Sequence, residues 1–196
     1  MLTRAEAFEL IRELVDDPEG VRWRDRQLVL YTTVTLDSLW GQILQMVPLA
    51  RVAEEELEVV EERADLEGLE ERLFRIQEVR VGERRIPEGP GYWKRMGSWL
   101  YLGFPAEKIE VLYSHRPPRF KDLGEEDLVP WPDGHEDAYL HEVAGRLLTK
   151  GGAEDPSVHL QIARESMQGM YAVLQRSGSM PLQQRMESTP AEWGSM

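Results

Sequence analysis

Residues 87–118 constrain the fold most, because they read as two strands joined by a turn. Residues 98–103 (SWLYLG) are rich in aromatic and apolar side chains, and residues 104–106 (FPA) form a turn signal. Residues 108–114 (KIEVLYS) then alternate in polarity, as a strand with one buried face does. The sequence RPP at 116–118 ends this strand. Since helical patterns lie on both sides, the segment predicts a helical domain that carries a β-hairpin insertion.

Four segments carry the spacing of amphipathic helices, at about 4–15, 24–46, 135–150 and 156–176. The first opens with Thr3 and Glu6 in the positions of a capping box. The second contains a run of Val and Thr that also favours a strand. A segment of about 22 residues without a turn signal is too long for an ordinary strand, so a helix is the better interpretation.

The β insertion is expected at about 55–115. Within it, residues 72–81 (RLFRIQEVRV) alternate well, and residues 82–84 (GER) read as a hairpin turn. The fold class predicted is therefore α+β, mainly α. It has a four-helix body, an inserted small antiparallel sheet of three or four strands, and an extended C-terminal tail at 177–196. Residues 1–176 are expected to form a single domain.

Composition excludes several classes of function. The 196 residues contain no cysteine, which removes thiolate catalysis and disulfides, and no apolar run reaches the ~18 residues that span a bilayer. The N-terminus lacks the pattern of a signal peptide. The net charge is −13, with ten acids and one base between Glu54 and Glu71. Such a chain is a poor general binder of phosphates, although an acidic wall would let DNA slide past. Abundant Glu and Arg resemble the bias of heat-adapted proteins.

No cluster of residues has the spacing of an active site. His135 and His141 are six residues apart, which places them on different faces of a helix, whereas a zinc-peptidase helix needs two His four apart. His115 and His159 are expected to pack or to cap. The chain also lacks a glycine-rich phosphate loop with its Lys and a hydrolase-type Ser elbow. We therefore predict no catalytic residue, no metal and no cofactor.

Aromatic side chains concentrate between residues 93 and 113, with few basic residues among them, which favours packing and protein contacts over stacking with nucleic acid. We expect a protein partner to contact the insertion and the C-terminal tail. The candidate contact residues are Trp99, Tyr101, Phe104, Met180, Met186, Pro190 and Trp193.

The order of these features resembles the head-to-tail adaptor proteins of tailed bacteriophages. A short helix comes first, and WRDRQL at 23–28 opens a long helix. The insertion with SWLYLGFP and KIEVLYSHRPP comes next, then a proline-rich connector (116–134), and HEDA at 135–138 leads into two closing helices. The resemblance covers about residues 3–176.

The resemblance implies a structural virion protein, made in the host cytoplasm, that forms a ring of usually twelve copies beneath the portal protein. Such a ring extends the DNA channel, touches the genome only passively, and offers a platform for tail or neck proteins. It implies no enzymatic activity and no contact with a membrane. Our own hypothesis is that the tail at 177–196 grips the portal, with Trp193 as a candidate anchor.

Three alternatives remain open. One is a neck stopper or tail-completion protein, which would bind one level further down. Another is a small phage-encoded metal-dependent enzyme, which would need a convergent carboxylate or His cluster. The third is a helical interaction protein of a cell.

Overall fold

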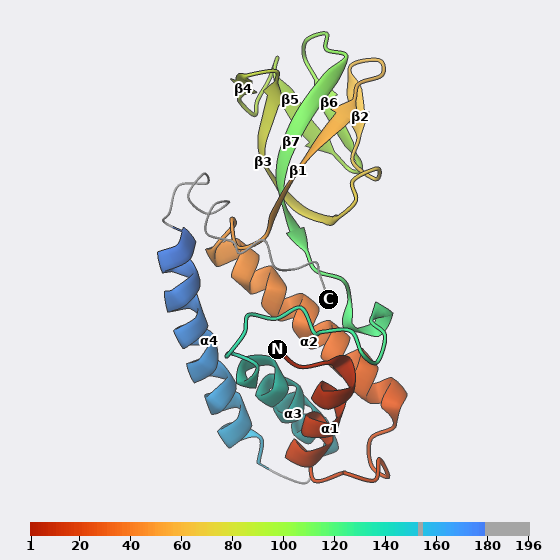
Figure 1. Ribbon diagram of the computed structural model, residues 1–196, viewed down its shortest axis with the longest axis vertical. Helices are drawn as coiled ribbons and strands as arrows, with labels where there is room; N and C mark the ends of the chain where they lie inside the picture. The colour runs from red at the N-terminus through yellow and green to blue at the C-terminus, as the bar shows by residue number, and fades with distance from the viewer. Residues whose placement is uncertain (153–154, 179–196) are drawn as a thin grey trace. The chain divides into compact units, whose positions relative to one another are not determined.

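The computed structural model describes residues 1–152 and 155–178 (Figure 1). The chain divides into two compact units. The helical unit comprises residues 1–39 and the chain from residue 119 onward, and the β unit comprises residues 40–118. The β unit is therefore an insertion in the sequence of the helical unit. The predicted tail at 177–196 lies outside the described residues from residue 179.

Four helices form most of the described structure outside the strands: α1 (Arg4–Leu14), α2 (Asp25–Met46), α3 (Asp137–Gly151) and α4 (Ser157–Gly178). A short 3₁₀ helix, η1 (Phe120–Asp122), lies in the proline-rich connector. The capping box predicted for the first helix is confirmed, because the Thr3 side chain accepts from the Glu6 amide and Glu6 accepts from the Thr3 amide. The run of Val and Thr is helical, and within it the Thr33 hydroxyl donates to the Val29 carbonyl.

The loop between α1 and α2 is held by the buried carboxylate of Asp17. Its oxygens accept from the backbone amides of Arg22 at 3.0 Å and Trp23 at 2.7 Å. Burial by itself raises the pKa of Asp17, but these hydrogen bonds outweigh it and leave the pKa below its ordinary value. Asp17 is therefore ionised at neutral pH and fixes the path of the chain into α2.

The core of the helical unit is built from the apolar faces of its helices and the connector. The Trp131 ring meets the Tyr139 ring edge-on with centroids 5.5 Å apart, and the Phe8 and Phe120 rings stack at 5.7 Å. These contacts tie the connector to α3 and α1. The largest fully buried side chains of this unit are Ile11, Leu28, Phe120, Tyr139, Leu147, Leu148 and Met170.

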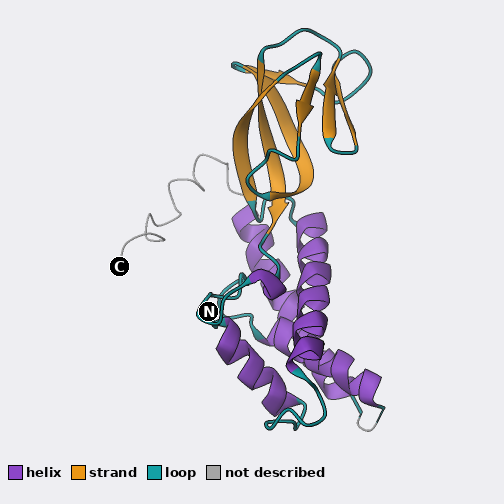
Figure 2. Ribbon diagram, turned by 90° about the vertical axis from the view of Figure 1, so that its right-hand side faces the viewer, coloured by secondary structure: helices purple, strands orange, loops and turns teal. Residues whose placement is uncertain are grey.

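Seven antiparallel strands make up two sheets in the β unit (orange in Figure 2). The four-stranded sheet has the order β1-β7-β3-β4, and the three-stranded sheet has the order β2-β6-β5. The strands are β1 (Val52–Glu58), β2 (Arg63–Asp65), β3 (Arg72–Val81), β4 (Arg84–Ile86), β5 (Trp93–Met96), β6 (Trp99–Leu102) and β7 (Lys108–Arg116).

The expected fold class, mainly α with a small sheet, is wrong. Of the residues that the structure describes, 41% are helical and 25% are in strands, and the strands form two sheets where one was expected. The second sheet was not expected because two of its three strands, β2 and β5, were not recognised in the sequence. Each is only three or four residues long and rich in charge, so neither shows the alternation by which a strand is recognised in a sequence.

Both sheets share one hydrophobic core. Leu57, Val79 and Ile109 from the first sheet are buried in the same cluster as Leu100 and Leu102 from the second. The Trp93 indole also donates to the Ile86 carbonyl at 2.9 Å, which joins β5 to β4. None of the described helices is long and apolar enough to span a membrane.

Candidate interaction surfaces

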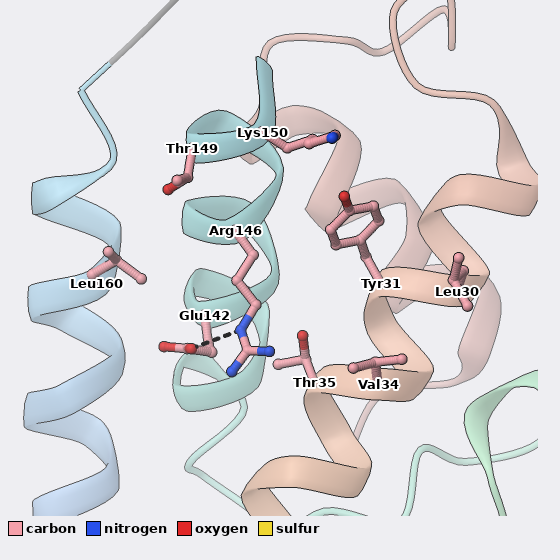
Figure 3. Close-up of a pocket in the computed structure, with 9 residues that line it drawn as sticks. All are labelled: Leu30, Tyr31, Val34, Thr35, Glu142, Arg146, Thr149, Lys150 and Leu160. Atoms are coloured by element: carbon pink, nitrogen blue, oxygen red, sulfur yellow. Dashed lines mark hydrogen bonds and ion pairs between the residues drawn. The ribbon is translucent and has the colours of Figure 1, made fainter. Parts of the chain in front are cut away.

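An open groove of about 770 Å³ lies on the helical unit, between side chains of α2, α3 and α4 (Figure 3). On its α2 side, Leu30 is 60% exposed and Val34 is 52% exposed, although both are large and apolar. Leu160 of α4 forms the opposite side. Half-exposed apolar side chains around a groove are typical of a surface that binds another protein. We call this surface the apolar groove. Its lining residues are Leu30, Tyr31, Val34, Thr35, Glu142, Arg146, Thr149, Lys150 and Leu160.

Helix α2 contributes Tyr31 and Thr35 to the polar lining of the apolar groove. The other polar lining residues all lie on one side of α3. Arg146 Nε donates to Glu142 Oε1 at 2.9 Å, one helical turn away (Figure 3). The Thr149 hydroxyl is satisfied by the Gly145 carbonyl at 2.7 Å. Glu142 and Arg146 therefore satisfy each other, and the Thr149 hydroxyl is satisfied by the backbone of its own helix.

Helices α3 and α4 pack closely beside the groove. A Cβ atom on Gly145 would lie 2.6 Å from Leu160 Cδ2, so a larger residue there would require the Leu160 side chain to shift. Nearby, the imidazole Nδ1 atoms of His141 and His159 are 2.9 Å apart. Burial lowers the pKa of His141, and His159 lowers it further. The two side chains therefore bridge α3 and α4 as a hydrogen-bonded pair only while at least one is neutral.

The outer face of the four-stranded sheet carries charge in an unusual order. Strand register places Glu56, Glu110, Arg80 and Arg85 directly opposite one another, on β1, β7, β3 and β4 in turn. This charge row thus reads acid, acid, base, base. Like charges directly opposite each other on neighbouring strands are destabilising, so the row does not follow the usual alternation of sign.

The two edges of the β unit carry the same signs of charge as the two ends of the charge row. The acidic edge consists of β1, β2 and the turn between them, and the basic edge consists of β4 and β5 at the opposite side of both sheets. The exposed acids of the acidic edge are Glu54, Glu56, Glu58, Glu61, Glu62 and Asp65, and the exposed bases of the basic edge are Arg84, Arg85, Lys94 and Arg95. The β unit is therefore polarised in charge from one edge to the other.

The aromatic residues predicted to contact a partner occupy different positions in the β unit. Trp99 and Tyr101 share the outer face of β6 and are half-buried, and the Arg63 guanidinium lies 5.2 Å from the Trp99 ring centroid. Phe104 packs against the core of the unit. The structure brings Trp99 and Tyr101 together on one face, and their role as partner contacts stays a prediction. Met180, Met186, Pro190 and Trp193 lie outside the described residues.

Buried polar groups at one end of β7 hold the acidic segment in place. The Tyr113 hydroxyl donates to Glu55, whose carboxylate also accepts from the Glu70 amide at 3.1 Å. Burial and this carboxylate raise the pKa of Tyr113. His115 Nδ1 lies 3.2 Å from Glu71. These contacts give the acids at 55 and 71 a structural role, whereas the exposed ones form the acidic edge.

The His residues weighed as metal ligands are not part of a metal centre in the described ranges, 1–152 and 155–178. No group of three or more His, Asp or Glu lies close enough there to hold an ion. Sequence reasoning missed the pairing of His141 with His159, because contact between two helices does not follow from spacing along one. It also missed the charge row, whose members become neighbours only through strand register.

No protein-family model matches this chain, and no curated protein matches it significantly. Any function assigned to the chain therefore rests on its own sequence and geometry.

Proposed function

We propose that this chain is a structural virion protein, a head-to-tail adaptor that forms a ring beneath the portal of a tailed bacteriophage. The observation that carries the proposal is the order of the elements along the chain. A long helix, α2, leads into an inserted β unit, and a proline-rich connector returns the chain to α3 and α4. This is the order of elements by which the sequence resembles head-to-tail adaptors.

The exposed surfaces of the helical unit support an assembly role. The apolar groove leaves Leu30 and Val34 half-exposed on a helix whose other face is packed. A ring subunit needs surfaces that its neighbours or its platform cover, and closed rings form when such contacts are heterologous. We expect the apolar groove to be covered when the chain assembles on the portal. The acidic net charge suits a channel through which DNA moves without sticking.

The test is the location of the chain in finished particles. Antibodies against the purified chain should label the head–tail junction of virions and leave heads that lack tails and portals unlabelled. Labelling at the distal end of the neck would favour a stopper or tail-completion protein. Absence of the chain from particles, or turnover of a substrate by the purified chain, would contradict the proposal.

A further inference from the structure

We propose that neighbouring copies of this chain bind each other through their β units, with the acidic edge of one copy against the basic edge of the next. This inference rests on the proposed function, because it names the contact that joins the copies of the ring. It is carried by the register and charge of the β unit, independently of any resemblance.

The first step is that both edges are open. Strands β1 and β4 are the outermost strands of the four-stranded sheet, so each has one side without a strand partner in this sheet. Edge strands offer unpaired backbone N–H and C=O groups to another chain. The basic edge has exposed apolar surface as well, since Met96 of β5 is 54% exposed.

The second step is direction. Adjacent strands in the order β1-β7-β3-β4 are all antiparallel, so β1 and β4 run in opposite directions. A second copy in the same orientation, displaced along the sheet, therefore presents its β1 antiparallel to β4 of the first. The sheet can continue from copy to copy without inverting either of them.

The third step is charge. Continuing the charge row across such a contact places Glu56 of the next copy beside Arg85. Within one copy, Arg85 faces another base, Arg80, and Glu56 faces another acid, Glu110. Arg85 is 70% exposed and lies 3.4 Å from Glu78, while Glu56 is 54% exposed and pairs with Lys108. The contact between copies gives each end of the row a neighbour of opposite sign.

The same edges disfavour the wrong assemblies. Two acidic edges or two basic edges would bring like charges together, and Glu83 and Glu88 beside the basic edge are too few to offset its four bases. Only the contact between unlike edges is favourable, and it is heterologous. A repeated heterologous contact closes into a ring when each copy is rotated by a whole fraction of a turn relative to the last, and otherwise it gives an open filament.

The test uses the absence of cysteine from the chain. Full-length Glu56→Cys and Arg85→Cys variants, alone and as an equal mixture, are oxidised mildly at low salt and separated on non-reducing gels. The mixture should form the mixed disulfide dimer several-fold more than either variant forms a homodimer. Added salt should lower the yield, because exposed charges are screened over about 8 Å at physiological ionic strength.

A cysteine that is out of register provides a matched control. Glu61→Cys, at another exposed acid of the acidic edge, should form less mixed disulfide with Arg85→Cys than Glu56→Cys does, because pairing Glu56 with Arg85 places residue 61 beyond the end of β4. Circular dichroism checks that all variants fold. A mixture that forms no more dimer than the single variants overturns the inference, and so does a basic edge that instead binds duplex DNA. Either result would overturn this inference and leave the proposed function to be decided by particle labelling. If mixed dimers form but the chain is absent from particles, the inference stands and the proposed function is refuted.

Discussion

Loss of the two exposed apolar side chains on α2 should weaken assembly on the portal without weakening the fold. The change is Leu30→Gln with Val34→Gln. Fully burying a Leu or Val side chain is worth about 1.5–3 kcal/mol, and slightly more than half of each is exposed here. Covering the exposed part should thus contribute about 1 kcal/mol each. Together they amount to about 2 kcal/mol, or roughly a 30-fold rise in the dissociation constant.

The assay is cosedimentation of the chain with purified rings of the portal protein encoded in the same genome, over a range of chain concentrations. Val158→Gln is the matched control, because Val158 is 63% exposed on α4 but does not line the apolar groove. All three substitutions lie on exposed helix positions, so the midpoint of thermal unfolding should change little. Equal affinity of the groove variant and the control for the portal would refute the assignment of the groove.

Three further predictions concern stability. Leu100→Ala should lower the free energy of unfolding of the β unit by about 2–5 kcal/mol, whereas Tyr101→Ala on the outer face of the same strand should lower it far less. Urea unfolding followed by tryptophan fluorescence compares the two variants, and equal losses would contradict the alternation of buried and exposed side chains along β6. Asp17→Asn should cost about 1–3 kcal/mol near pH 7, through weakened hydrogen bonds to two backbone amides. Because the pKa of Asp17 is lower in the folded chain, this difference should shrink as the pH falls below about 4, and a difference that is constant with pH would argue against an ionised Asp17. The pKa of His141 is lowered in the folded chain, so the contribution of this side chain to stability falls as the pH drops below about 6.5. His159→Gln should remove part of that fall in thermal melts, and an unchanged pH profile would count against the pair.

Local signals in the sequence identify much of the helical unit. Thr3 and Glu6 lie where a capping box requires, and α2 stays helical through its Val and Thr residues because its length and its buried face override their preference for strands. Gly152 ends α3 in the left-handed conformation that glycine favours. Each of these features depends on residues within a few positions of one another.

Features that depend on distant residues could not be predicted in the same way. Strand β5 pairs with β6 through a tight turn at Gly97, yet its sequence WKRM has one buried side chain and three exposed ones. The charge row joins residues from four strands, so it exists only once register is fixed. His141 and His159 come from two different helices, so their contact depends on how α3 packs against α4.

The most direct measurement for the central claim is the mass of the complex that this chain forms with the portal ring. Native mass spectrometry of purified portal rings mixed with an excess of the 22.6 kDa chain should show the ring gaining one closed set of about twelve copies. A portal ring whose mass stays unchanged at every concentration of the chain would contradict the account.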